Sequence, residues 1–234
     1  QTAYSLAFTN APDFETDAST DGDGDYDVTV TINDGAQDGA TITYVVTVTD
    51  TNDESPVFTS SDTINVAEGA TAVVTLTSTD GDAADSGGPT YAIDTNDNNL
   101  FSINGAVVTL TNAADFETPG CGSSSNTCTI VVSATDLNSQ VTQQTITVTI
   151  TDVNDQTPTY TAGDTTPSVA EGTTAVDTAV AITDTDTGDA NVCTLAGSDA
   201  ALFTCTLTGQ TAYSLAFTNA PDFETDASTD GDGD

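Results

Sequence analysis

Residues 145–158 read T-I-T-V-T-I-T-D-V-N-D-Q-T-P, and this stretch joins a strand pattern directly to an acidic segment. In its first half, threonine alternates with isoleucine or valine. This alternation is typical of a half-buried β-strand, because successive side chains point to opposite faces. In its second half, Asp152, Asn154 and Asp155 precede Pro158. The stretch therefore predicts a β-strand that leads into an acidic linker.

The same pattern occurs elsewhere in the chain, at a nearly constant spacing. Three pairs of segments match: 49–56 with 151–158 and 9–16 with 111–118, both at an offset of 102, and 66–69 with 169–172, at an offset of 103. The repeating unit is thus about 100 residues, the size of one domain. Residues 210–234 also repeat residues 1–25 without a mismatch, which gives a longer period of 209 residues. We expect the chain to be a cut length of a tandem array.

Short stretches of alternating threonine and aliphatic residues predict further strands. They are residues 28–32, 42–48, 73–76, 107–110, 130–132 and 146–150. No segment shows a sustained helical period, so the predicted fold class is all-β. We expect tandem antiparallel seven-stranded Greek-key β-sandwiches of immunoglobulin-like architecture. Residues 1–55 would be the C-terminal half of one domain, 56–157 a complete domain, and 158–234 the N-terminal part of another.

The charge excludes whole classes of partner. The chain has 37 Asp and Glu residues and no Lys, Arg or His, which gives a formal net charge of −37. Nucleic acid and anionic membrane surfaces are excluded, because both require cationic side chains. No apolar run approaches the roughly 20 residues of a membrane span, so no span is expected in this segment. Hydrophobic residues make up 36% of the chain, enough for a core.

The acidic residues gather at the same places in each repeat, which a merely solubilising surface does not require. Asp80 and Asp82 have one residue between them, as do Asp184 and Asp186. On an extended backbone such pairs point the same way and can share an ion. Ca²⁺ fits best, because it takes six to eight oxygen ligands, whereas Mg²⁺ prefers a smaller hydrated octahedron and Zn²⁺ would require His or Cys.

The four cysteines form two local pairs, Cys121 with Cys128 and Cys193 with Cys205. Four cysteines allow three connectivities, and the local one is favoured because the other two would bridge different domains. Free buried thiols are the alternative. Disulfides would place the chain in an oxidising compartment, outside the cell or on its surface. In that setting, the exposed threonine and serine residues are candidates for O-linked glycans.

Several motifs occur in a fixed order along the chain. They are Val-Ala-Glu-Gly at 66–69, Asp-Gly-Asp at 80–82, Asp-Phe-Glu at 115–117, Ala-Thr-Asp at 134–136, and Asp-x-Asn-Asp-x-x-Pro at 50–56 and 152–158. With these motifs the chain resembles tandem cadherin-type repeats, here of a microbial extracellular adhesin or fibre. The resemblance covers essentially the whole chain.

This resemblance implies that Ca²⁺ binds at junctions between successive domains. The implied ligands of the first junction are Asp13, Glu15, Asn52, Asp53, Asp80, Asp82 and Asp136, with the carbonyls of Thr51 and Glu54. Those of the second are Glu68, Asp115, Glu117, Asn154, Asp155, Asp184 and Asp186, with the carbonyls of Val153 and Gln156. Glu171, Asp222 and Glu224 are the matching residues of the last domain, and Asp34 matches Asp136. Bound Ca²⁺ is expected to stiffen the linkers.

The incomplete domains at the two ends suggest how copies associate. We expect the two halves to complement each other between copies in a continuous fibre, so the partners would be other copies of the chain, end to end and also laterally. A second acidic segment, residues 17–27, resembles Asp-x-Asp-Gly calcium loops. It lacks the Glu that closes an EF-hand loop and the flanking helices, so we expect a solvated loop.

Three functions compete on this evidence. An enzyme is not expected, because the chain has no His or Lys and no Ser or Cys with a base beside it, and because the carboxylate pairs recur in every repeat. A homophilic or heterophilic cell-adhesion module is the alternative. The leading hypothesis is a calcium-binding structural repeat of a long extracellular filament or adhesin stalk. Near-identical repeats lengthen an array without diversifying its binding surfaces.

Overall fold

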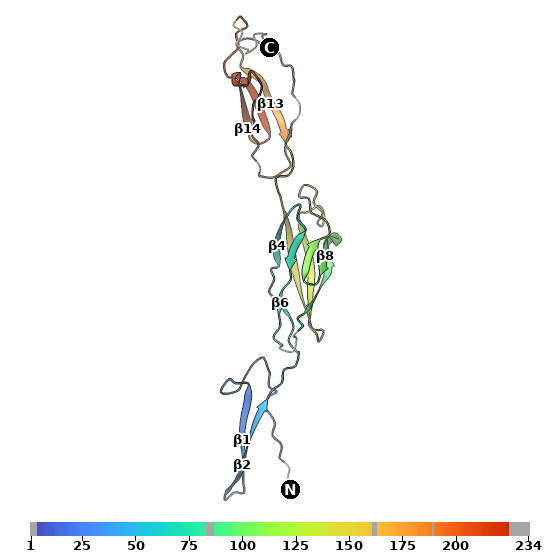
Figure 1. Ribbon diagram of the computed structural model, residues 1–234, viewed down its shortest axis with the longest axis vertical. Helices are drawn as coiled ribbons and strands as arrows, with labels where there is room; N and C mark the ends of the chain where they lie inside the picture. Colours follow the sequence, from blue (N-terminus) through green and yellow to red (C-terminus); the bar gives the residue numbers. More distant parts are fainter. Residues whose placement is uncertain (1–3, 83–86, 161–162, 189, 225–234) are drawn as a thin grey trace. The chain divides into compact units, whose positions relative to one another are not determined.

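The computed structural model describes residues 4–82, 87–160, 163–188 and 190–224 (Figure 1). The chain divides into two compact units. Unit 1 is Gln1–Ala114 with Pro119–Ile150, and unit 2 is Asp115–Thr118 with Thr151–Asp234. The last ten residues of the exact repeat, 225–234, lie outside the described residues.

Strands dominate both units, as the all-β prediction requires. In unit 1 the strands are β1 (Asp25–Asn33), β2 (Asp38–Thr47), β3 (Val57–Phe58), β4 (Thr63–Ala67), β5 (Ala72–Thr75), β6 (Ser78–Thr79), β7 (Thr90–Asn96), β8 (Phe101–Asn104), β9 (Val107–Leu110), β10 (Thr127–Thr135) and β11 (Val141–Thr151), with a 3₁₀ turn η1 (Asp97–Asn99). In unit 2 they are β12 (Thr159–Tyr160), β13 (Ala175–Thr183), β14 (Phe203–Thr208) and β15 (Ala212–Phe217), with the 3₁₀ turn η2 (Ala200–Leu202).

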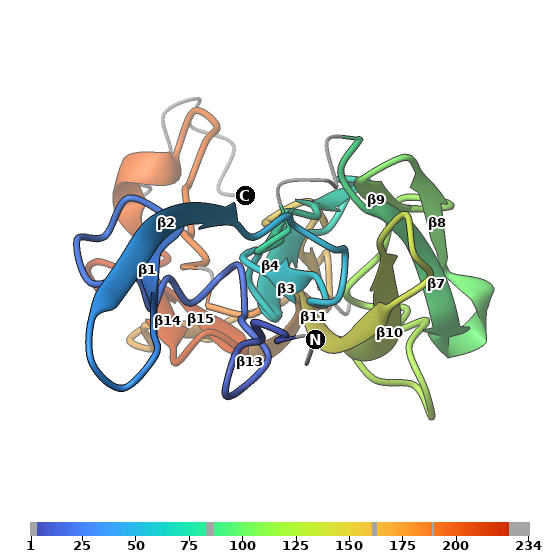
Figure 2. The same ribbon diagram turned by 90° about the horizontal axis from the view of Figure 1, so that it is seen from below.

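The strands from β3 to β11 form a β-sandwich, and we call these strands with their connecting loops the central domain (residues 57–151). One sheet has the order β4-β11-β10-β7, the other β5-β9-β8, and β3 pairs with β6. Figure 2 shows β8 and β9 side by side in this domain. If β3 with β4 and β5 with β6 are each counted as one interrupted strand, seven strands result, as predicted. These strands pair only with one another in the part of the chain that is described.

The core of the central domain follows from the alternation in β10 and β11. Ile130 pairs with Ile146 and Cys128 with Val148 in the antiparallel register, and all four side chains are 0% exposed. The threonines between them point outward or lie half-buried. Burying an aliphatic side chain contributes about 1.5–3 kcal/mol, so this alternation supplies the main driving force for the sandwich.

The two flanking segments lack such a core. The β1–β2 hairpin is a separate two-stranded sheet, and residues 4–55 contribute no buried apolar side chain to the described structure. Unit 2 forms one sheet with the order β12-β13-β15-β14, and Val180 is its only buried hydrophobic side chain among the described residues. That these segments are half-domains, and where the domain boundaries lie, stay predictions.

Both predicted local disulfides are formed, Cys121–Cys128 and Cys193–Cys205, and no described cysteine is free. The first closes a loop that leads into β10, and both of its cysteines are buried. The alternative of free buried thiols is therefore wrong.

Replacing Cys121 and Cys128 together by alanine should lower the unfolding free energy of the central domain by about 2–3 kcal/mol, because the denatured chain then loses its loop constraint. Urea unfolding monitored by circular dichroism measures this change. The paired variant Cys193→Ala/Cys205→Ala is the control and should leave the urea midpoint of the central domain unchanged. An unchanged midpoint in the first variant would show that the bridge carries no stability.

Candidate metal centres

A short turn after β6 places two aspartates close together. Asp82 donates its backbone N–H to Oδ1 of Asp80 at 3.1 Å, and Oδ2 of Asp82 accepts the backbone N–H of Glu54 at 2.9 Å. Gly81 lies between them, and a Cβ there would lie 3.3 Å from Cγ of Glu54 and 3.6 Å from Cγ of Glu15. The missing side chain of Gly81 therefore lets both glutamates approach this turn.

A third aspartate follows the end of β10. Asp136 is 6% exposed, and its Oδ1 accepts the backbone N–H groups of Asn138 at 2.9 Å and Gln140 at 2.7 Å. The side-chain amide of Asn138 donates to the carbonyl of Asn52 at 2.8 Å. These contacts tie the acidic linker to the loop after β10 and fix the direction of the Asp136 carboxylate.

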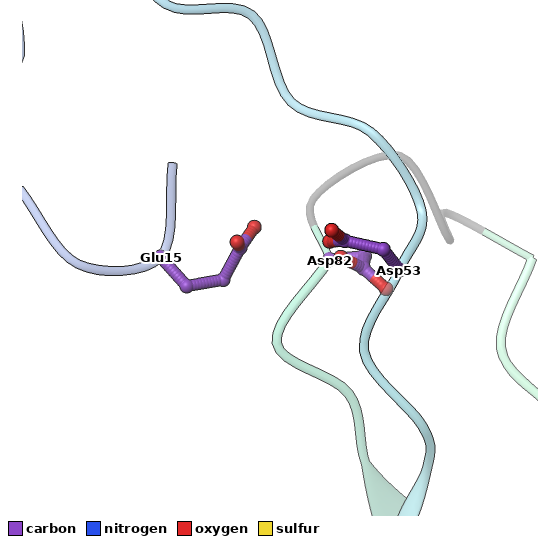
Figure 3. A group of neighbouring side chains, drawn as sticks. All are labelled: Glu15, Asp53 and Asp82. Carbon is purple, nitrogen blue, oxygen red and sulfur yellow. The ribbon is translucent and has the colours of Figure 1, made fainter. Parts of the chain in front are cut away.

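The acidic residues of unit 1 form two overlapping groups. Carboxylate oxygens of Asp80, Asp82 and Asp136 lie within 4.8 Å of one another, and so do those of Glu15, Asp53 and Asp82. In Figure 3, Glu15 reaches from its own loop toward Asp53 and Asp82. We call these five residues the first acid site. Asp82 belongs to both groups, so the two candidate cation sites adjoin each other.

In three aspartates of this site, Asp80, Asp82 and Asp136, the two carboxylate oxygens have different surroundings. One oxygen of each accepts backbone N–H groups: Oδ1 of Asp80, Oδ2 of Asp82 and Oδ1 of Asp136. The other oxygen of each is buried and has no hydrogen-bond partner among the described residues, and the same holds for Oδ1 of Asn52. Burying an ionised oxygen without a partner costs several kcal/mol, so these atoms point to a bound cation.

Repulsion among the carboxylates gives the same indication. Two like charges about 5 Å apart repel by roughly 3 kcal/mol at an effective dielectric constant of about 20. A hydrogen bond from its own backbone lowers the pKa of Glu15, but desolvation, Asp13 and the charges of Asp50 and Asp53 together raise that pKa above its ordinary value. The chain has no cationic side chain. The neutralising charge must therefore come from solution.

The donor set fits Ca²⁺. Every ligand atom offered by the first acid site is a carboxylate oxygen, and Ca²⁺ takes six to eight oxygen ligands in flexible geometry. Zn²⁺ prefers nitrogen and sulfur, but the chain has no His and its described cysteines are in disulfides. The residues present thus suit a hard cation of the size of Ca²⁺.

Unit 2 repeats this arrangement, in a group that we call the second acid site. Carboxylate oxygens of Glu117, Asp152 and Asp186 lie within 4.8 Å of one another. Oδ2 of Asp186 accepts the backbone N–H of Gln156 at 2.8 Å, and Oδ1 of Asp184 accepts that of Asp186 at 3.3 Å. Oδ2 of Asp152 accepts hydrogen bonds from Thr187. Oδ1 of Asp152 and Oδ1 of Asp186 are buried without a partner in the described structure.

A third group lies elsewhere in unit 2. Glu171, Asp222 and Glu224 bring carboxylate oxygens within 4.8 Å of one another, and all three residues are exposed. Oε2 of Glu171 accepts the backbone N–H of Phe223 at 3.4 Å. In unit 1, Asp34 resembles Asp136 in its contacts, because its Oδ1 accepts the backbone N–H groups of Gln37 and Ala36, and these bonds lower its pKa.

Several predicted ligands belong to none of the acidic groups described above for unit 1 and unit 2. Oδ1 of Asp13 accepts the backbone N–H groups of Glu15 and Thr16, and Oδ1 of Asp115 accepts that of Thr118, so these aspartates cap the turns that present Glu15 and Glu117. The remaining members stay predictions: Glu68, Asn154, Asp155 and the carbonyls of Thr51, Glu54, Val153 and Gln156.

The sequence motifs contained one more candidate ligand than we assigned. Asp152, the first residue of the second acidic linker, belongs to the second acid site, and its counterpart Asp50 raises the pKa of Glu15 through its charge. The sequence could have identified both aspartates, since each is the first residue of a repeated Asp-x-Asn-Asp motif.

The acidic loop at residues 17–27 shows local contacts. The side chain of Asp17 accepts the backbone N–H of Ser19 at 2.8 Å, and bonds from Ser19 hold the pKa of Asp17 below its usual value. Asp23 accepts the backbone N–H of Asp25 at 3.0 Å. These bonds stabilise turns within the loop, and its solvated character stays a prediction.

Comparison with known proteins places the central domain in a family. The family model described as "Cadherin domain" matches residues 62–151. No curated protein sequence matches the chain. Among solved structures, the protocadherin gamma B7 cis-dimer of extracellular domains 3–6 is 26% identical, with 86% of this chain and 52% of that chain covered and a TM-score of 0.61.

Two further structures share the fold. Protocadherin gamma B2 extracellular cadherin domains 3–6 are 22% identical, with 88% of this chain and 53% of that chain covered and a TM-score of 0.64. The human desmocollin-1 ectodomain is 20% identical, with 92% and 42% covered and a TM-score of 0.63. The chain thus spans about half the length of the solved structures that it matches.

Proposed function

Since residues 62–151 belong to the cadherin domain family, we propose that the chain is a calcium-binding structural repeat of a long extracellular filament or adhesin stalk, stiffened by Ca²⁺ at its acidic linkers. The division of the aspartate oxygens in the first acid site carries this proposal. In Asp80, Asp82 and Asp136, one oxygen is held by backbone N–H groups and the other is buried without a partner in the described residues. Such oxygens are oriented before any ion arrives, so little reorganisation opposes binding.

The stiffening follows from where the ligands lie in the chain. Glu15 comes from the turn before β1, Asp53 from the linker after β2, and Asp82 from the turn after β6. A cation held by all three would join these segments, because each of them would have to give up a ligand before it could move away. Without the cation, the same carboxylates repel one another.

An extracellular setting is supported by the relatives and by the disulfides. The matching protocadherin structures are described as extracellular cadherin domains. Two disulfides are formed, as is usual in an oxidising compartment. The described residues contain no helix with the length and apolar character needed to cross a membrane. The family also supports a non-enzymatic role. O-linked glycans on the threonine-rich strands stay a prediction, which an intact mass above the sequence mass would support.

A cell-adhesion module is the second candidate. It is favoured by the family and by the relative that was solved as a cis-dimer. Adhesion requires recognition between side surfaces of separate arrays, whereas a stalk requires only stiffness along one array. Electron microscopy of the chain in Ca²⁺ distinguishes the two, because an adhesion module would join separate arrays side by side, whereas a stalk repeat would leave single arrays that extend only end to end.

Counting bound ions tests the calcium proposal. A native mass spectrum of the chain in Ca²⁺ is expected to show at least two bound ions, one for each acid site, and calorimetry should give dissociation constants on the order of 0.1–1 mM or tighter. Mg²⁺ at the same concentration is the control and should bind more weakly. A spectrum that shows only the metal-free mass at saturating Ca²⁺ would contradict the proposal.

A further inference from the structure

The loop after β10 contacts the acidic linker through two side-chain amides. Nδ2 of Asn138 donates to the backbone carbonyl of Asn52 at 2.8 Å, and Nε2 of Gln140 donates to the same carbonyl at 3.4 Å. Oε1 of Gln140 in turn accepts the hydroxyl of Ser55 at 3.1 Å. All three hydrogen bonds join uncharged groups. The linker is therefore tied to the central domain by contacts that involve no carboxylate and require no ion.

The backbone of the same loop holds a carboxylate of the first acid site. The N–H groups of Asn138 and Gln140 both donate to Oδ1 of Asp136, and the N–H of Asp136 donates to the carbonyl of Gln140 at 3.1 Å. Ser139, between the two, has a φ of 71°, a left-handed conformation that is unfavourable for residues other than glycine. Such a conformation persists only where the surrounding contacts enforce it, so these hydrogen bonds fix the shape of the loop.

Both residues that the loop holds have one side-chain oxygen left over. Oδ1 of Asn52 and Oδ2 of Asp136 are buried and have no hydrogen-bond partner among the described residues. The backbone carbonyl of Asn52 already accepts two hydrogen bonds, one for each lone pair, so the side-chain oxygen is the atom of this residue that an ion can use. The next residue along the chain, Asp53, has a carboxylate oxygen within 4.8 Å of those of Glu15 and Asp82. The unpartnered amide oxygen thus belongs to a residue directly beside the first acid site in the chain.

We propose that Asn138 and Gln140 are positioning residues for the cation of the first acid site, because they hold the linker so that Oδ1 of Asn52 becomes a ligand. Neither amide contacts the ion itself. One short loop binds both Asn52 and Asp136, so it aligns the linker ligand with the ligand at the end of β10 before an ion arrives. This inference rests on the proposed function, because it names residues that set the Ca²⁺ affinity of the same site.

Calorimetric titration of the whole chain with Ca²⁺ tests this role. The double variant Asn138→Ala/Gln140→Ala should weaken binding at the first acid site about tenfold, as the loss of a ligand's hydrogen-bond partner does in metal sites. Asn98→Ala is the matched control and should keep the parent affinity. Asn98 is also an exposed loop asparagine of the central domain, and its Nδ2 donates to the carbonyls of Gly120 at 2.8 Å and Gly122 at 3.4 Å. The second acid site, in unit 2, is the internal reference and should keep its affinity in both variants.

The coordination of the ion separates positioning from a merely structural role. Eu³⁺ is a hard cation that prefers oxygen ligands, as Ca²⁺ does, and its luminescence lifetimes in H₂O and D₂O count the water molecules bound to it. When the amides are removed and Asn52 leaves the ion, water takes the vacated position. The water count, summed over the bound ions, should therefore rise by about one in Asn138→Ala/Gln140→Ala, because one oxygen ligand has been replaced. Asn52→Ala should give the same rise, and Asn98→Ala should give none.

A double-mutant cycle with Asn52→Ala shows whether the amides act through Asn52. In the Asn52→Ala background, removing both amides should weaken Ca²⁺ binding much less than in the parent, because the ligand that they position is already gone. Fully additive losses overturn the inference, and so does a parent-like affinity or water count in Asn138→Ala/Gln140→Ala.

The results also separate the two proposals. The melting transition in EDTA shows which variants fold, and Asn138→Ala alone, which keeps the Gln140 amide, should show the same losses in smaller measure. A parent chain that binds no Ca²⁺ in the native mass spectrum would overturn the proposed function together with this inference. A parent that binds Ca²⁺ while the amide variants bind it equally well would overturn only the inference.

Discussion

Excess EDTA is expected to lower the melting temperature of the central domain by roughly 10–20 °C. A ligand at about a hundred times its dissociation constant stabilises the folded state by about 2.7 kcal/mol, and each kcal/mol shifts the melting temperature of a domain of this size by about 4–8 °C. In the first acid site, metal removal also exposes the full repulsion among Glu15, Asp53 and Asp82, whose oxygens lie within 4.8 Å of one another. Differential scanning calorimetry measures the shift.

Two controls make this result specific. Added Ca²⁺ in excess over EDTA should restore the original melting temperature, whereas added Mg²⁺ should restore it only in part, because Mg²⁺ demands a smaller octahedral site. Raising NaCl after chelation should recover some stability by screening the carboxylates. An equal melting temperature in Ca²⁺ and in EDTA would contradict the calcium account.

The variant Asp82→Asn is expected to change the stability in opposite directions with and without Ca²⁺. The amide oxygen of asparagine can still accept the backbone N–H of Glu54, but the other ligand oxygen and the charge are lost. Because Asp82 belongs to both groups of the first acid site, Ca²⁺ affinity should fall at least about tenfold. In EDTA the variant should be more stable than the parent by about 1 kcal/mol, because one repelling charge is gone.

Asp62→Asn is the matched control for this experiment. Asp62 lies in the same domain, is exposed, and has one side-chain hydrogen bond, from the hydroxyl of Thr63. The control removes the same charge, so it should leave both the Ca²⁺ affinity and the melting temperature close to those of the parent. A stability loss in Asp82→Asn that is equal in Ca²⁺ and in EDTA would mean that Asp82 supports the fold rather than an ion.

Part of the fold could be predicted from sequence because several of its strands alternate strongly. The six predicted strands all overlap observed ones, from β1 and β2 to β10 and β11. Strands such as β13 and β15 were missed, because alanine, serine and aspartate interrupt their alternation. Their strand structure depends on pairing with neighbours, for example between Leu215 and Asp177, which no local pattern reveals.

The acid sites were predictable in part. Motif spacing identified Glu15, Asp53 and Asp82, which the structure brings together. Motif spacing did not show that Asp13 and Asp115 would each use one carboxylate oxygen to accept a backbone N–H of its own turn. Such hydrogen bonds depend on the loop conformation. The spacing also gave no sign that Asp82 would be shared between two groups, since that depends on where the loops after β6 and β10 meet.

A crystal structure of the chain grown in Ca²⁺, with anomalous differences recorded, tests the central claim most directly. The account predicts an anomalous peak about 2.3–2.6 Å from carboxylate oxygens of the first acid site, with the unpartnered Oδ1 of Asp82 among its ligands. A second peak is expected beside Asp152 and Asp186. Well-ordered carboxylates with no anomalous peak at Asp82, in crystals saturated with Ca²⁺, would contradict it.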